Sequence, residues 1–140
     1  STPCGTLFPY TTLFRSEATG QAIKAAGIKK VGLLGTRFTM EKGFYADWLE
    51  KHFEIDTIIP NETERHVIHK VIYDELVQGS ITKASKEAFL KVITRLATEG
   101  AEGIILGCTE IPLLVQQEDV EIPLFDTTAI HAEAAVNKAM

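Results

Sequence analysis

The stretch GIILGCTE, residues 103–110, decides how this chain is expected to fold. Its apolar core at 104–106 is a short run without alternation, which is typical of a strand buried on both faces. A second run of the same kind, VGLLGT, occupies residues 31–36. Strands of this type occur in parallel sheets that helices cover on both sides.

Helical spacing and cap residues occupy most of the sequence around these runs. Asn61 and Glu64 have the spacing of a capping box, and glycines at 27, 79 and 100 mark helix ends. We predict helices over 17–26, 40–52, 61–79, 82–99 and 127–140, and strands over 31–34, 55–59, 104–106 and 123–125. Strands that alternate with helices need crossover connections, so the sequence predicts an α/β fold with a parallel sheet of about four strands flanked by helices.

Composition excludes several functional classes. The 140 residues carry 14 Lys and Arg against 19 Asp and Glu, a formal net charge of −5, so no broad basic surface for nucleic acid is expected. No apolar stretch approaches the length of a membrane span, and the first residues lack the pattern of a signal peptide. We therefore expect a cytoplasmic protein with neither a nucleic-acid nor a membrane partner.

The first 16 residues differ from the rest in composition. They hold Pro3, Pro9 and four threonines, have no charge before Arg15, and follow neither helical nor strand periodicity. They resemble a translated adapter sequence, so we interpret 1–16 as a non-native leader of irregular structure and 17–140 as the natural domain. A genuine extended arm is the alternative. Cys4 then carries no function, and two cysteines so far apart give no reason to expect a disulfide.

Two loops are candidates for a ligand site, because ligands bind beyond the carboxyl ends of parallel strands. Gly35 and Thr36 follow the first strand and can present N–H and hydroxyl groups to a carboxylate or phosphate. Gly107, Thr109 and Glu110 surround Cys108 after the third strand. A plain turn with a hydroxyl cap is the alternative for Gly35 and Thr36.

Cys108 is the candidate reactive group. A buried cysteine usually only packs, but the start of a helix favours the thiolate, which acts as a base or nucleophile. No second cysteine follows closely, which excludes a dithiol redox motif, and Leu114 stands where a phosphate-transferring loop has Arg. A Cys–His hydrolase using His131 and a non-catalytic binding domain stay open.

Two further patterns are weak. Glu62, His66 and His69 have a spacing that can hold a divalent metal, but no convincing ligand set completes it, so we expect no metal site. Gly35 after a strand, with Asp56 further along, is faintly similar to the sequence fingerprint of dinucleotide-binding folds. The glycine spacing of that fingerprint is absent from this chain.

Several stretches together are similar to one family. They run from about residue 23 to the end and are 32–36, 39–41, 44–45, 68–69, 72–76, 106–114, 123–128 and 130–132. In this setting LGCTEIPLL, residues 106–114, is the specific one. The chain resembles the aspartate/glutamate racemases, which are amino-acid racemases that use no cofactor.

The resemblance implies two similar α/β lobes facing each other across a cleft, each with one cysteine. One thiolate removes the α-proton of a small amino acid while the opposing thiol returns a proton from the other face. It places Cys108 as the catalytic cysteine of the second lobe. Thr36 and Thr109, with Gly35, Gly107 and Glu110, become candidate substrate-binding residues, and no metal or pyridoxal phosphate is expected.

The chain also departs from the family pattern. It has no counterpart of the first-lobe cysteine, and Gln78, Gly79 and Ser80 occupy the region of a basic substrate-contacting residue. We therefore expect the second lobe of a racemase, inactive by itself, with the helix over 127–140 reaching toward the first lobe and leaving an apolar patch. The sequence does not decide which amino acid is inverted. A homodimer is the oligomeric state that we consider.

Overall fold

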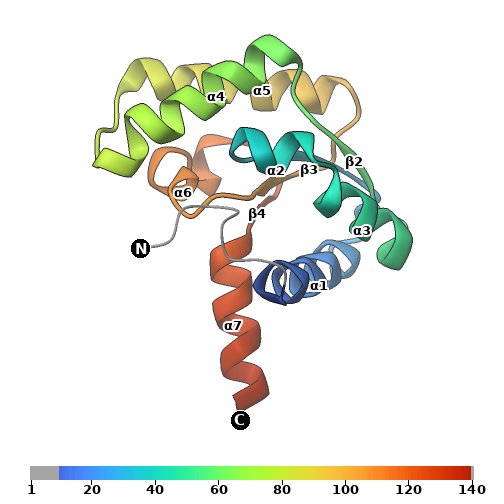
Figure 1. Ribbon diagram of the computed structural model, residues 1–140. Helices are drawn as coiled ribbons and strands as arrows, with labels where there is room; N and C mark the ends of the chain where they lie inside the picture. The colour runs from blue at the N-terminus through green and yellow to red at the C-terminus, as the bar shows by residue number, and fades with distance from the viewer. Residues whose placement is uncertain (1–9, 140) are drawn as a thin grey trace.

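The computed structural model describes residues 10–139, in which one layer of parallel strands lies between two layers of helices (Figure 1). The strands are β1 (Lys30–Leu34), β2 (Asp56–Ile58), β3 (Gly103–Leu106) and β4 (Leu124–Asp126). The helices are α1 (Tyr10–Ala25), α2 (Arg37–Glu41), α3 (Phe44–Phe53), α4 (Glu62–Asp74), α5 (Lys83–Thr98), α6 (Ile111–Leu114) and α7 (Thr127–Ala139), with 3-10 turns η1 (Leu76–Gln78) and η2 (Gln117–Asp119).

The four strands lie in the order β2-β1-β3-β4, and every neighbouring pair is parallel. The predicted fold class is therefore confirmed. The two predicted runs form the centre of the sheet, where Leu34 of β1 is the register partner of Leu106 of β3. The chain passes from β1 to one neighbour, β2, and then crosses back to the other, β3. This reversal places the topological switch point of the sheet between β1 and β3.

Two hydrophobic cores cover the two faces of the sheet. Leu33 and Ile105 pack in the core shared with α1 and α3, whereas Leu34, Ile104 and Leu106 pack in the core shared with α4 and α5. Figure 1 shows these helix pairs on opposite sides of the strands. Because successive side chains of a strand point to opposite faces, an uninterrupted apolar run fills both cores.

The predicted helix starts agree best with the structure where a side chain caps the helix. Asn61 accepts the backbone N–H of Glu64, and the Glu64 carboxylate accepts that of Asn61, both at 2.9 Å, so the capping box is confirmed. Thr82 caps α5 by accepting the N–H of Ser85. The helix predicted over 61–79 ends earlier, however, because the chain tightens into η1 after Asp74.

Two predictions near the front of the chain were wrong. Residues 10–16, expected to be irregular, belong to α1, whose sequence has neither glycine nor proline before Gly20 to stop the helix. Residues 1–9 lie outside the described part. The helix predicted over 40–52 is two helices, because Gly43 adopts a left-handed conformation with φ of 77° and separates α2 from α3.

The last helix leaves the sheet. Figure 1 shows α7 running away from the strands beside α1. Thr127 at its start is buried, whereas Ala129 and Ala132 are exposed. The expectation that this helix reaches toward a first lobe and leaves an apolar patch stays a prediction, and the side chains from residue 135 onward lie outside the description. Within the described residues, no helix has the length and apolar character needed to span a membrane.

Candidate active site

Two turns meet at the carboxyl edge of the central strands. Gly35 and Thr36 follow β1, and Gly107 and Cys108 follow β3, so both turns lie on the same edge as predicted. The N–H of Gly107 donates to the carbonyl oxygen of Leu34 at 2.7 Å and joins the two turns. The pair stands at the switch point of the sheet, where α/β proteins bind ligands.

Thr36 is the N-cap of α2 and is 2% exposed. Its Oγ1 accepts the backbone N–H of Thr39 at 3.4 Å and lies 3.2 Å from the Thr39 hydroxyl oxygen. Thr36 has the extended backbone of an N-cap residue, and its side chain accepts one of the N–H groups that have no partner within the helix. The cap ties the turn to the start of α2.

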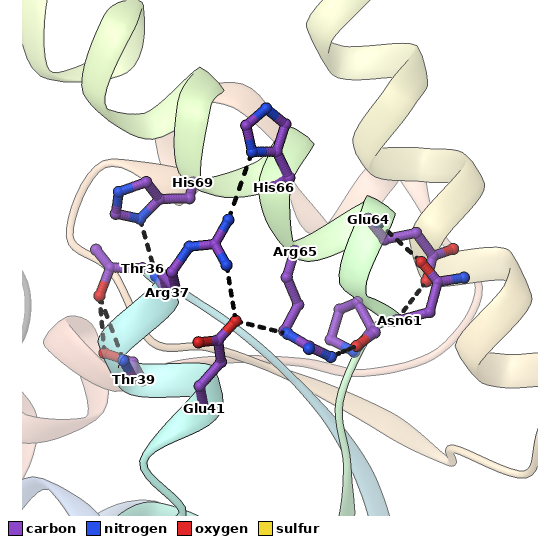
Figure 2. Close-up of polar contacts among 10 residues, drawn as sticks. Thr36, Arg37, Thr39, Glu41, Asn61, Glu64, Arg65, His66 and His69 are labelled. Atoms are coloured by element: carbon purple, nitrogen blue, oxygen red, sulfur yellow. Dashed lines mark hydrogen bonds and ion pairs between the residues drawn. The ribbon is translucent and has the colours of Figure 1, made fainter.

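Another N–H of this turn binds a side chain from α4. The backbone N–H of Arg37 donates to Nδ1 of His69 at 2.9 Å, as Figure 2 shows. The sequence prediction assigned the N–H groups of this turn to a ligand. Those of Arg37 and Thr39 are already used inside the protein, so the Thr36 hydroxyl and the remaining backbone groups are what the turn offers.

Charged side chains line the outer side of the same turn. The Glu41 carboxylate accepts Nη1 of Arg37 and Nε of Arg65, both at 3.0 Å (Figure 2). The hydrogen bond from Arg65, supported by Arg37, lowers the pKa of the Glu41 carboxyl below its ordinary value. These contacts connect α2 to α4 on the solvent side, and because they are exposed they add little stability.

Cys108 lies next to a carboxylate. Its side chain is 1% exposed, and its Sγ lies 3.0 Å from Oε2 of Glu110. The Thr109 hydroxyl donates to the same carboxylate oxygen at 2.6 Å. In the reduced protein this geometry places a thiol within hydrogen-bond reach of a proton acceptor that Thr109 holds in place.

The structure differs from the sequence prediction in the state of this sulfur, because Cys108 is disulfide-bonded. The other cysteine, Cys4, lies outside the described residues. A domain of this size needs no cross-link to hold its core, so there was no reason in the sequence to expect this state of the sulfur. Proton transfer by Cys108 therefore belongs to the reduced form.

Comparison with known proteins identifies the family. The family model for Asp/Glu/hydantoin racemases matches residues 15–135. The chain belongs to this racemase family. A solved structure of a candidate Asp/Glu racemase from Yersinia pestis is 49% identical, with a TM-score of 0.86 over 89% of this chain and 54% of that one.

Two further relatives agree with the racemase assignment. An aspartate racemase homologue from Pyrococcus horikoshii OT3 is 36% identical, with a TM-score of 0.83 over 89% of this chain and 54% of that one. A glutamate racemase from Hydrogenobaculum sp. (strain Y04AAS1) is 31% identical over 71% of this chain and 36% of its own length. The chain thus spans about half the length of the solved racemase relatives.

Sequence reasoning missed two residues that contact the two strand-end turns. The buried Thr127 hydroxyl donates to the carbonyl oxygen of Leu106 at 3.1 Å and fixes the end of β3 just before Cys108. His69 was considered only as a metal ligand. Within the described part of the chain, no three His, Cys, Asp or Glu side chains form a group suited to a metal ion. For Thr127 the available signal in the sequence was a threonine directly after a short strand. Nothing in the sequence linked His69 to Arg37.

Proposed function

We propose that this chain supplies one proton-transferring face of an amino-acid racemase that needs neither a metal nor pyridoxal phosphate. The observation that carries the proposal is the joining of two turns by the bond between Gly107 and Leu34, with Cys108 in one and Thr36 in the other. A reduced cysteine beside a buried hydroxyl combines an acid/base group with a group that binds a carboxylate.

Cys108 acts in two directions in this mechanism. As a thiolate it takes the α-proton of one enantiomer, leaving a carbanion whose charge spreads into the α-carboxylate. A thiol on the opposite face donates its proton to the same carbon and inverts it; in the reverse reaction Cys108 is the donor. Glu110, 3.0 Å away, exchanges the proton with Cys108 and lets one sulfur serve in both forms.

The charges at the site orient the substrate. The Glu110 carboxylate repels carboxylates and attracts the ammonium group of an amino acid. Thr36, on the neighbouring strand, then receives the α-carboxylate, with Gly35 and Gly107 allowing close approach of the backbone and Thr109 holding Glu110. The names of the relatives favour aspartate or glutamate as the substrate, whereas Gln78, Gly79 and Ser80 supply no cation for a second carboxylate, so the substrate class we propose is acidic or small amino acids.

The geometry favours proton transfer over the two alternatives. A Cys–His hydrolase needs an imidazole at the nucleophile, whereas the contact that supports proton transfer is that of the Cys108 Sγ with the Glu110 carboxylate. A non-catalytic binding domain has no need of a carboxylate held against a buried sulfur. Because the reaction requires a reduced thiol, we propose that the protein works in the cytoplasm, where thiols are kept reduced.

The test uses the chain under reducing conditions, alone and joined to the part of the Yersinia pestis relative that it does not cover. Each protein is incubated in heavy water with L- and D-aspartate and with L- and D-glutamate, and the enantiomer ratio and α-deuterium are measured. We expect no inversion by the chain alone and inversion by the joined protein, lost in Cys108→Ala. A joined protein whose Cys108→Ala variant keeps its activity would overturn the proposal.

A further inference from the structure

His69 reaches from α4 to the backbone that follows Thr36. Its Nδ1 accepts the Arg37 N–H at 2.9 Å (Figure 2). Its half-buried ring lies 4.7 Å, centroid to centroid, from the ring of Tyr73. A backbone N–H can only donate, so Nδ1 carries no proton in this contact. The structure therefore selects the neutral imidazole with its proton on Nε2.

This contact controls the orientation of one peptide group. Arg37 is the first residue of α2 and Thr36 is its N-cap, so the peptide that links them leads directly into the turn beside Cys108. The Thr36 hydroxyl is held from the other side by Thr39. Removing the His69 acceptor leaves this peptide without its own hydrogen bond to α4, because the ion pair of Glu41 with Arg65, which also joins the two helices, is made by side chains and leaves the peptide free to turn.

The charges around His69 come from both helices packed at this point. Arg37 and Glu41 belong to α2, and His66 and Asp74 belong to α4. Burial is the main effect that lowers the pKa of His69 below its ordinary value; Arg37 and His66 add to it, while Asp74 and Glu41 oppose it. The contact with Arg37 is thus intact at neutral pH and is lost on acidification below the ordinary range of histidine, about 6.5.

We propose that neutral His69 is a positioning residue that holds the Thr36–Arg37 peptide in the orientation that binds the substrate carboxylate. Protonation of Nδ1 turns the acceptor into a donor, breaks the contact and releases the turn. Substrate binding then weakens as the pH falls. This inference rests on the proposed function, in which Thr36 binds the α-carboxylate.

Three variants separate the acceptor from the rest of the side chain. His69→Asn places an amide oxygen close to the position of Nδ1 but does not titrate, and His69→Ala removes the acceptor. His66→Asn is the matched control, one turn earlier on the same helix, where the side chain is exposed and lies 3.4 Å from Nη2 of Arg37.

Two measurements on the reduced chain test the inference. Hydrogen exchange of the Arg37 amide, followed by NMR without any ligand, reports the contact itself. We expect protection in the wild type and His69→Asn and faster exchange in His69→Ala. The Kd for L-aspartate, followed at the Thr36 and Arg37 amides at pH 8 and pH 5.5, reports the consequence for binding.

We expect aspartate to bind the wild type and His66→Asn a few-fold more weakly at pH 5.5, because a lowered pKa leaves His69 only partly protonated there, His69→Asn equally at both pH values, and His69→Ala weakly at both. Wild-type affinity in His69→Ala, or an unchanged acid loss in His69→Asn, would overturn the inference. If the wild type binds no aspartate at either pH, the substrate role of Thr36 fails and the binding role of His69 fails with it; the Arg37 exchange rates still decide whether His69 holds the turn.

Discussion

The backbone N–H of Gly107 donates to the carbonyl oxygen of Leu34 at 2.7 Å, one residue beyond the last pairing of β3 with β1. This bond extends the sheet past its strands and sets the spacing of the two turns that carry Thr36 and Cys108. The proposed site is therefore positioned by the two central strands of the sheet.

Substitution of Gly107 should disturb both turns. A Cβ at this position would lie 3.0 Å from the Leu34 carbonyl oxygen and 3.3 Å from Cγ2 of Thr39, and the oxygen is backbone that cannot rotate away. We expect Gly107→Ala to lower the free energy of unfolding by about 1–3 kcal/mol, measured by urea denaturation. It should also shift the amide signals of Thr36 and Cys108.

Gly27→Ala is the control for this substitution. It adds a methyl group that meets nothing within 4 Å, at a φ of 75°, so it should cost about 1 kcal/mol through backbone strain alone. The signals of the two turns should not move. The prediction is contradicted if Gly107→Ala has the unfolding free energy of the wild type and the amide signals of Thr36 and Cys108 do not shift. The strand ends would then accommodate the added methyl group without cost.

The Thr127 hydroxyl should stabilise the end of β3. Thr127→Val leaves the carbonyl oxygen of Leu106 buried without this donor, and we expect a loss of about 1–2 kcal/mol in urea unfolding. Thr98→Val is the matched control, because its hydroxyl makes the same kind of bond, to the Thr94 carbonyl oxygen at 3.0 Å, at an exposed position. Equal effects of the two substitutions would contradict a special role for Thr127.

The ion pair of Glu64 and Arg95 predicts a pH dependence of stability. The hydrogen bond from Arg95, with help from the Asn61 N–H, lowers the pKa of the Glu64 carboxyl below its ordinary value of 4.5. The folded protein thus binds this proton more weakly than the unfolded chain does. The stabilisation is complete above about pH 4.5 and is lost as the pH falls below that value.

Glu64→Gln tests this charge by itself, because glutamine still serves in a capping box. At pH 7 we expect the wild type to be more stable than the variant by about 1 kcal/mol, and at pH 3 we expect the difference to shrink toward zero. Glu118→Gln, at an exposed position, should change nothing at either pH. A gap for Glu64→Gln that stays constant from pH 7 to pH 3 would refute the assignment.

Glu110 should be required for activity rather than for folding. Glu110→Gln keeps the shape of the side chain and an acceptor for the Thr109 hydroxyl, but the amide does not take up a proton from Cys108. In the reduced, joined protein we expect racemisation to fall about 10²–10⁴-fold with little change in unfolding free energy. Full activity in this variant would remove Glu110 from the proposed mechanism.

The sequence predicted those parts of the structure that depend on nearby residues. Apolar runs placed the central strands, and parallel pairing alone required Thr36 and Cys108 to share an edge. Cap spacing placed the start of α4. Gly43 was misjudged because a glycine within a helical pattern either continues or breaks the helix, and only the tertiary structure decides which.

The fine geometry of the site lay beyond sequence reasoning. Whether Glu110 turns toward Cys108 or toward solvent depends on side-chain rotamers within a turn. The contact between His69 and Arg37 depends on how α4 packs beside α2, across a long stretch of intervening chain. Such pairings come from packing between elements, and a periodicity within one element does not contain them.

The bond between Gly107 and Leu34 also has a consequence for how the protein folds. The chain between β1 and β3 contains α2, α3, β2, α4, η1 and α5, so the two turns meet only after this whole segment has formed a closed loop. Contacts so distant in sequence delay folding and belong to its later steps. A nascent or partly unfolded chain thus has helices and strand segments but no assembled pair of turns, and whatever chemistry the site performs switches on with the last stage of folding.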